Sequence, residues 1–243
     1  MSSELYEPVD LSGLTVAITG AAGGIGRALA QGFRSDGATV VGGDLAANLE
    51  ALAEVCDVAV PIDVTSPDDN ERLVAAAVDA GGRLDAFIAN AGIATSGRFD
   101  SQQWDSIEAV LRVNLDGVLH GMRAAVPVMR RQGSGRIVVT ASRNAELCQR
   151  GMLAYNASKA AVIAAVRTLA HELRDVDICV NNLIPGVSAT GIWGSEEATP
   201  DIARDPALAY PTARFLATVP PGGPTGQTWF DMERWPMWKD FDT

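Results

Sequence analysis

The strongest constraint on the fold is an alternation of short apolar runs and longer amphipathic segments along the chain. Short apolar runs predict buried strands, and the segments between them have the residue spacing of helices. The predicted strands cover residues 14–19, 39–43, 58–62, 84–89, 136–140, 178–183 and 228–230, and the predicted helices cover residues 25–35, 67–80, 101–131, 154–173 and 206–217. This rhythm predicts an α/β fold, in which helices cover both faces of a doubly wound parallel sheet.

The length and composition fit one domain. A chain of 243 residues that is 47% hydrophobic can bury a single large core, so we expect residues 1–243 to form a single domain. The proline- and glycine-rich residues 220–224 predict a turn inside this domain and not a linker between two domains.

The charge and the cysteines exclude several classes of partner. A net charge of −11 predicts neither a nucleic-acid partner nor an anionic membrane partner, since both need a basic surface. No apolar stretch approaches the roughly 18 residues of a membrane span. The three cysteines lie far apart without metal-ligand spacing, and no signal peptide opens the sequence. These features predict reduced thiols, no metal site and a cytoplasmic location.

A glycine-rich turn, residues 19–26, joins the first predicted strand to the first predicted helix. Glycines also close ordinary tight turns, but this position between strand and helix favours a dinucleotide site. Gly20 allows the tight turn, Gly24 lets the backbone approach a pyrophosphate, and Gly26 lets the helix pack closely on the strand. Ile25 lies at the helix start, where free N–H groups favour phosphate. We therefore predict that Gly20, Gly24, Ile25 and Gly26 bind a dinucleotide in a Rossmann-like sheet.

An acidic residue, Asp44, ends the second predicted strand. A carboxylate at this offset from the glycine turn accepts hydrogen bonds from the adenosine ribose hydroxyls and repels a 2′-phosphate. No basic residue stands inside the glycine turn or directly after the strand. Asp44 therefore predicts NAD as the cofactor over NADP; the alternative is a solvated acid at a strand end.

Tyr155 and Lys159 are spaced i and i+4 on a predicted helix, so the phenol and the ammonium share one face. A phenol with its ordinary pKa of about 10 is a poor base at neutral pH, but nearby positive charge favours the phenolate. Ser142, at the end of a predicted strand, can hold a substrate oxygen with which Tyr155 exchanges a proton. The tyrosine–lysine spacing alone occurs by chance in many helices.

With Asn114 upstream, the set Ser142, Tyr155 and Lys159 and the glycine turn resemble the short-chain dehydrogenase/reductase family, of the short single-domain type. The resemblance covers about residues 12–192. It implies an NAD-dependent oxidoreductase that moves a hydride between nicotinamide and a secondary alcohol or ketone, with Tyr155 as acid/base. It also implies that the Asn114 side chain, in the middle of a long helix, binds a water that links Lys159 to solvent.

The same resemblance implies further cofactor contacts and an assembly. Asp63 and Val64 would meet the adenine, and the turn Asn90, Ala91 and Gly92 would lie beside the cofactor. Pro185, Gly186 and Thr190 would form the turn that meets the nicotinamide carboxamide. Family members with paired long helices form homotetramers, so we expect a homotetramer here.

The sequence departs from the family pattern in two places. About fifteen residues follow Thr190 before the next helix, which predicts a short substrate lid. Three tryptophans crowd into residues 229–238, and this segment predicts either a core or interface patch or a cover for the substrate pocket. Near Ser142, Arg143 or Arg150 could meet an anionic substrate, although a surface arginine is the commoner role.

Three functions compete at this stage. The first is an NAD-dependent dehydrogenase of a small-molecule alcohol, or reductase of the carbonyl. The second is an NADP-dependent carbonyl reductase of the 3-oxoacyl type. The third is a dinucleotide-binding protein without catalysis, which the presence of Asn114, Ser142, Tyr155 and Lys159 disfavours. The substrate itself does not follow from the fold.

Overall fold

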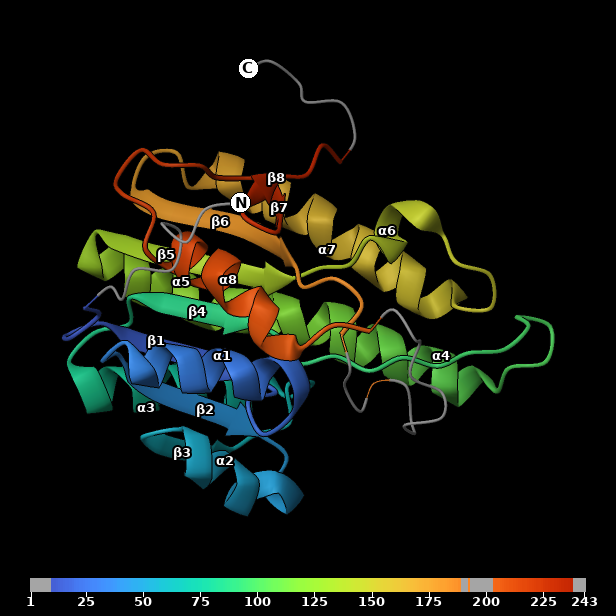
Figure 1. Cartoon of the computed structure of the whole chain (residues 1–243), viewed down its shortest axis with the longest axis horizontal. Helices are drawn as coiled ribbons and strands as arrows, with labels where there is room; N and C mark the ends of the chain where they lie inside the picture. The colour runs from blue at the N-terminus through green and yellow to red at the C-terminus, as the bar shows by residue number, and fades with distance from the viewer. Residues whose placement is uncertain (1–9, 189–191, 193–202, 238–243) are drawn as a thin grey trace.

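The computed structural model describes residues 10–188, 192 and 203–237, and in this part of the chain a twisted central sheet lies between two layers of helices (Figure 1). The sheet has eight strands in the order β3-β2-β1-β4-β5-β6-β7-β8, and all neighbours pair parallel except β7 and β8. The strands are β1 (Thr15–Thr19), β2 (Thr39–Asp44), β3 (Val58–Pro61), β4 (Ala86–Ala89), β5 (Ser134–Thr140), β6 (Asp177–Ile184), β7 (Thr228–Phe230) and β8 (Glu233–Arg234).

The helices divide between the two faces of the sheet. They are α1 (Gly24–Ser35), α2 (Leu49–Val55), α3 (Pro67–Gly81), α4 (Trp104–Leu111), α5 (Gly117–Gln132), α6 (Asn144–Leu147), α7 (Leu153–Glu172) and α8 (Tyr210–Ala217). One buried cluster joins the sheet to α3, α5 and α7, and the other joins it to α1, α2 and α8. In β1, Ala17 belongs to the first cluster and its neighbours Val16 and Ile18 to the second, because successive side chains point to opposite faces. The predicted α/β fold with a doubly wound parallel sheet is confirmed.

Local sequence signals determine both ends of α3. Ser66 caps α3, because its Oγ accepts a hydrogen bond from the Asp69 backbone N–H at 3.3 Å, and Pro67 takes the first helical position. Gly82 ends the same helix in the left-handed conformation, with φ of 75°. These contacts agree with the sequence prediction for this helix to within one residue.

The helix expected over residues 101–131 differs from the prediction in two ways. Residues 101–103 are not helical, so the helix begins at Trp104. It is also interrupted by the π-helical turn η3 (Arg112–Asp116), which carries Asn114 and separates α4 from α5. A π turn inserts one extra residue into the helical ladder and turns side chains off the regular face, and such turns are frequent at functional sites.

Four short elements were not predicted. They are η2 (Ala46–Asn48), α2, α6 and β8. In the helix predicted over residues 206–217, the first four residues form the 3₁₀ turn η5 (Pro206–Ala209) and the rest form α8. Segments of two to seven residues are too short for a reliable periodic pattern. That residues 1–243 form one domain stays a prediction, since residues 1–9 and 238–243 lie outside the described ranges.

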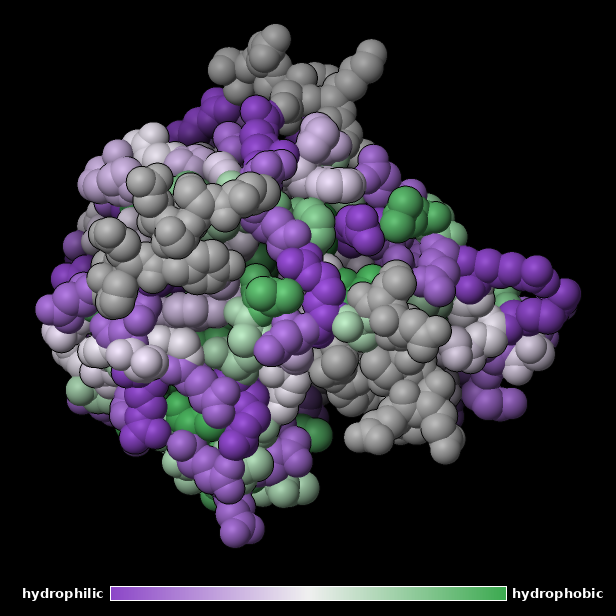
Figure 2. Space-filling model, viewed as in Figure 1, coloured by the Kyte–Doolittle hydropathy of each residue, from purple (hydrophilic) through white to green (hydrophobic). Residues whose placement is uncertain are grey.

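The visible surface is mixed in character. Figure 2 shows one face on which hydrophilic residues prevail and hydrophobic residues lie in scattered groups. None of the helices described here combines the length and the apolar character that crossing a membrane requires.

Candidate active site

A pocket of about 510 Å³ opens at the carboxyl ends of the parallel strands. The strand order reverses between β1 and β4, and ligands of doubly wound sheets bind at this reversal. Most of the sequence-predicted site residues line this one pocket: Gly20, Gly24, Ile25, Asp44, Asp63, Val64, Asn90, Ala91, Gly92, Ser142, Tyr155, Lys159, Pro185 and Gly186. Gly26 and Asn114 lie behind the lining, and Thr190 lies outside the described residues.

The glycine turn is crowded where the sequence predicts close approach. Gly20 has φ of 66°, and a Cβ there would lie 2.8 Å from the Cα of Ala91. A Cβ on Gly26 would lie 2.0 Å from the carbonyl oxygen of Gly20. A side chain at either position would force the first strand, the turn and the helix apart, so the cradle for a pyrophosphate depends on both glycines.

Asn90 connects three strands beside this turn. Its Nδ2 donates to the carbonyl oxygens of Thr19 and Gly20 at 3.1 and 3.3 Å, and its Oδ1 accepts from Thr140 Oγ1 at 3.2 Å. The Asn90 and Ala91 backbone N–H groups both donate to Thr19 Oγ1. This residue therefore fastens β1, β4 and β5 together at the pocket floor.

The Asp44 carboxylate lies at the pocket wall and is held by the turn it faces. Its Oδ2 accepts from the Ala22 backbone N–H at 3.0 Å, and its Oδ1 accepts from Leu45 N–H and Asn48 Nδ2 at 2.8 and 2.7 Å. Of the lining residues that the structure describes, Lys159 alone is basic. The glycine cradle and this wall fit a dinucleotide.

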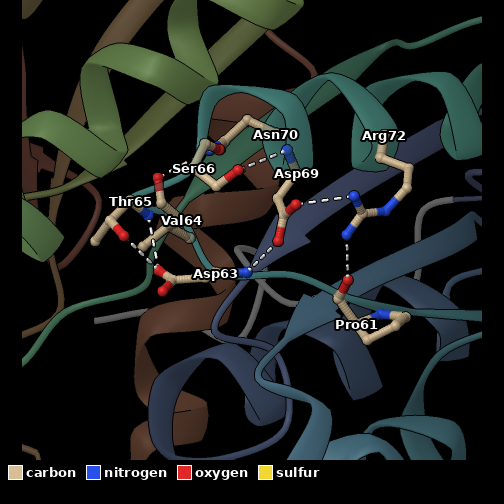
Figure 3. A network of polar contacts seen from close by, with 8 residues as sticks. All are labelled: Pro61, Asp63, Val64, Thr65, Ser66, Asp69, Asn70 and Arg72. Atoms are coloured by element: carbon tan, nitrogen blue, oxygen red, sulfur yellow. Dashed lines mark hydrogen bonds and ion pairs between the residues drawn. The ribbon is translucent and has the colours of Figure 1, made fainter.

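A polar network fixes the wall formed by Asp63 and Val64 (Figure 3). Buried Asn70 donates to the carbonyl oxygens of Val64 and Ser66 at 2.9 and 2.8 Å. The Asp63 backbone N–H donates to Asp69 Oδ2 at 2.8 Å. The Asp63 carboxylate accepts from the Thr65 backbone N–H and hydroxyl through Oδ1, so hydrogen bonds within the protein hold this turn.

Ser142 and Tyr155 meet at the other end of the pocket. Ser142 follows β5, and its Oγ accepts from the Asn144 backbone N–H at 3.1 Å. Burial raises the pKa of Tyr155, and a hydrogen bond with Ser142 partly opposes that rise. In the protein alone the phenol is therefore neutral at physiological pH.

Lys159 lies one turn along α7 from Tyr155, with its Nζ 5.7 Å from the centre of the phenol ring. Its Nζ donates to the carbonyl oxygen of Thr140 at 2.7 Å. The side chain is buried, and burial lowers the pKa of Lys159 to about 8. The ammonium thus stays largely charged at neutral pH, next to the phenol whose anion it would stabilise.

Asn114 is fully buried on the π turn and clamps the loop after β4. Its Oδ1 accepts from the Ile93 N–H at 2.8 Å, and its Nδ2 donates to the Ile93 carbonyl oxygen at 2.9 Å and to Ser158 Oγ at 3.2 Å. The resemblance implied that this side chain holds a water. Both of its polar atoms bind protein groups, and the water-binding role stays a prediction.

Neither arginine near Ser142 lines the pocket. Arg143 contacts aromatic rings of the C-terminal segment, and Arg150 is exposed. The wall beside Tyr155 is formed by Asn144, Gln149 and Met152. For Arg150 this exposure agrees with the commoner role of a surface arginine. Contact of either arginine with an anionic substrate stays a prediction.

The C-terminal tryptophan segment packs behind this wall. Met237 and Trp235 join a buried cluster with Ala141, directly before Ser142, and Ala145, three residues after it. Neither Trp235 nor Met237 lines the pocket, and Trp238 lies outside the described residues. The described part of this segment is a core patch next to the pocket, which is one of the two roles expected from the sequence. The role as a pocket cover stays a prediction.

Comparison with known proteins gives the family. The model of the short chain dehydrogenase family matches residues 14–201, which is more than half of the chain. This chain belongs to the short-chain dehydrogenase/reductase family.

Proteins similar to this short-chain dehydrogenase/reductase are named after different activities. It is 36% identical to 3beta-hydroxysteroid dehydrogenase 2 of Eggerthella lenta over 204 residues, 79% of this chain and 77% of the relative. It is 36% identical to a 3-oxoacyl-acyl-carrier-protein reductase of Thermotoga maritima over 217 residues, 84% of this chain and 85% of the relative.

Solved structures show the same fold. A 3-ketoacyl-(acyl-carrier-protein) reductase from Brucella melitensis complexed with NADH superposes with a TM-score of 0.83 at 28% identity, covering 90% of this chain and 96% of that one. A putative NAD(P)-dependent gluconate 5-dehydrogenase from Beutenbergia cavernae, with bound NADP, gives 0.79 at 29% identity, covering 91% and 96%. The chain is thus an oxidoreductase that uses a nicotinamide dinucleotide and acts on small molecules.

Sequence reasoning missed other lining residues of this short-chain dehydrogenase/reductase. They are mostly apolar or follow strand ends: Leu45, Asn48, Ile62, Ile93, Ala94, Val113, Thr140, Ala141, Val187 and Ile192. For those close to strand ends this position was the signal, whereas Val113 lies inside the helix predicted over residues 101–131 and carried none. In the described part of the chain, no three His, Cys, Asp or Glu side chains gather as metal ligands.

Proposed function

We propose that this protein is an NAD-dependent dehydrogenase of a secondary alcohol, which in reverse reduces the ketone. The observation that carries the proposal is that Ser142, Tyr155 and Lys159 line the same pocket as the glycine turn. A bound NAD would supply the hydride acceptor, held by the glycine turn, Asp44 and the Pro185–Gly186 turn.

The protein's own residues would handle the proton. Ser142 holds the substrate oxygen, and Tyr155 takes the hydroxyl proton as the hydride leaves the adjacent carbon. Because burial raises the pKa of Tyr155, the phenolate needs positive charge close by. Buried Lys159 supplies that charge from the next turn of α7.

NAD is proposed over NADP because of Asp44. Its carboxylate faces the pocket and has no basic neighbour in the described lining. The runner-up is an NADP-dependent reductase of 3-oxoacyl substrates. The names of one relative and one solved neighbour favour the 3-oxoacyl class, although that neighbour holds NADH, and a different neighbour holds NADP. Initial rates with NADH and NADPH on a ketone separate the two.

A panel of alcohols tests which class of substrate the protein oxidises. NADH formation is measured with secondary alcohols, sugars, dihydrodiols, hydroxysteroids and hydroxyacyl thioesters at saturating NAD. Turnover of at least one alcohol class with NAD supports the proposal. Tight NAD binding without turnover of any of them would favour a non-catalytic dinucleotide-binding protein.

We also propose a homotetramer in the cytoplasm. Trp104 on α4 and Leu119 on α5 are 63% and 40% exposed, which gives these paired helices an apolar face that a second copy can cover. Cys56, Cys148 and Cys179 are free thiols, as a reducing compartment favours. Sedimentation showing a stable monomer at micromolar concentration would refute the tetramer.

A further inference from the structure

The end of the described chain folds back onto the segment that carries Ser142. β7 and β8 form the edge of the sheet next to α7 (Figure 1). After β8, Met237 is buried in the cluster that contains Ala141, directly before Ser142, and Ala145, three residues after it. The Arg167 guanidinium donates to the Met237 carbonyl oxygen at 3.4 Å. This end of the chain is therefore packed in place and close to the reactive residues.

Arg143, directly after Ser142, is held by two aromatic rings of this segment. Its guanidinium carbon lies 5.4 Å from the centre of the Phe230 ring and 5.9 Å from that of Trp235. The two rings meet edge to face, with centres 5.7 Å apart. The ion pairs among the described residues do not include Arg143, so these rings are its main partners.

A second contact ties the same helix to the same ring. Trp235 Nε1 donates to Glu146 Oε2 at 3.2 Å. Arg143, at the N-cap of α6, and Glu146, inside α6, thus both contact Trp235. Asn144 at the start of α6 lines the pocket together with Gln149 and Met152, which follow this helix. A shift of Trp235 would move this wall.

The opposite wall is tied to the same hairpin. Arg204 lies 5.8 Å from the Phe230 ring centre and pairs with Asp231 at 2.7 Å. Its backbone N–H donates to the carbonyl oxygen of Val187, a lining residue, at 2.7 Å. Phe230 therefore contacts two arginines that lie next to lining residues, Arg143 beside Ser142 and Arg204 bonded to Val187.

The turn that links β7 to β8 is strained. Asp231 and Met232 have φ of 48° and 65°, in the left-handed region that residues with side chains rarely adopt. The Arg204 ion pair and a 3.0 Å hydrogen bond from Met232 N–H to Thr212 Oγ1 hold this conformation. Such strain is concentrated at sites where the surrounding structure over-determines the backbone.

We propose that Arg143 is a positioning residue. Its contact with Phe230 and Trp235 fixes Ser142 and the Asn144–Met152 wall relative to Tyr155, and so sets the affinity for the alcohol and the geometry of the transfer. The glycine turn and Asp44 lie at the far end of the pocket, so cofactor affinity does not depend on this contact. The inference rests on the proposed function for its kinetic readout.

The test compares Arg143→Met with Arg143→Lys and Trp235→Leu. We expect Arg143→Met to raise the alcohol KM about tenfold and to lower kcat, with the NAD Kd within about threefold of wild type. Arg143→Lys keeps the cation and should recover part of the loss. The double variant Arg143→Met with Trp235→Leu should lose less than the sum of the two single losses, because both single variants remove the Arg143–Trp235 contact. Arg150→Met, an exposed arginine of the same loop, is the matched control.

A readout independent of turnover separates this proposal from the proposed function. Hydrogen–deuterium exchange of residues 141–152 should be faster in Arg143→Met than in Arg150→Met, while residues 19–26 keep their exchange rates. If wild type oxidises no alcohol, the proposed function fails and the exchange result alone decides. Unchanged exchange in residues 141–152, or alcohol KM and kcat within twofold of wild type in a folded Arg143→Met protein, overturns the positioning role.

Discussion

The Nζ of Lys159 donates a 2.7 Å hydrogen bond to the carbonyl oxygen of Thr140. This contact holds a cation inside the protein at the end of β5, two residues before Ser142. The bond satisfies one donor only, and burial still lowers the pKa of Lys159 to about 8. The charge that would favour the Tyr155 phenolate is therefore maintained against a desolvation penalty.

This penalty predicts a pH-dependent stability. Lowering the pKa from 10.5 to about 8 corresponds to about 3 kcal/mol at about 1.4 kcal/mol per pH unit. The unfolded chain binds the proton more tightly, so this contribution to the free energy of unfolding rises with pH between those two values. Below about pH 8 the penalty is fully present. Denaturant unfolding of the cofactor-free protein measures it.

Lys159→Met removes the titration and serves as the reference. From about pH 7 to about pH 9.5, we expect the free energy of unfolding of wild type to rise by about 2 kcal/mol relative to the variant. The raised pKa of Tyr155 acts in the opposite direction above its ordinary value of 10, so the series stops below it. A constant difference between the two proteins would contradict the buried charge.

Asp44→Ala should weaken NAD binding and improve the use of NADP. The variant loses the ribose acceptor and the repulsion of a 2′-phosphate, and hydrogen bonds to a charged group contribute about 1.5–3 kcal/mol. We expect at least about a tenfold loss in NAD affinity, measured by titration calorimetry. Asp100→Ala, an exposed acid paired with Arg98, is the control. A wild-type enzyme that already prefers NADPH would contradict the role of Asp44 in excluding a 2′-phosphate.

Gly26→Ala should destabilise the fold as well as the cofactor site. The added Cβ would lie 2.0 Å from the Gly20 carbonyl oxygen and 2.6 Å from Asn90 Nδ2. Overpacking of this kind costs about 1–3 kcal/mol. Thermal unfolding without cofactor measures it, with Gly23→Ala as control because a Cβ there meets nothing within 4 Å. Equal melting temperatures for the two variants would argue against the close packing.

The features that could be predicted from the sequence are those that short local patterns determine. The parallel strands follow from β-type apolar runs, and the glycine turn and Asp44 follow from residue types required directly after strands. Their convergence in one pocket comes from the parallel topology, which gathers strand ends at one edge.

Features set by tertiary contacts could not be predicted. The amphipathic pattern continues through the π turn at Arg112–Asp116, and the turn is fixed by Asn114 bonding to Ile93 and by Gly117 packing on Val64. The turn at Asp231 and Met232 lacks the glycines that positive φ favours, since Arg204 and Thr212 hold it. Neither partner is near in sequence.

We expect Tyr155 to exchange the proton in the proposed NAD-dependent oxidation. This role is tested most directly by Tyr155→Phe, which removes the hydroxyl and leaves the ring packed against Ile107 and Val110. The rate of NADH formation with the best alcohol of the panel should fall by about 10²–10⁴-fold. The NAD Kd, measured on the same preparation, should stay within about threefold, under about 0.7 kcal/mol. NADH formation near the wild-type rate in the variant would rule out Tyr155 as the proton-exchanging group.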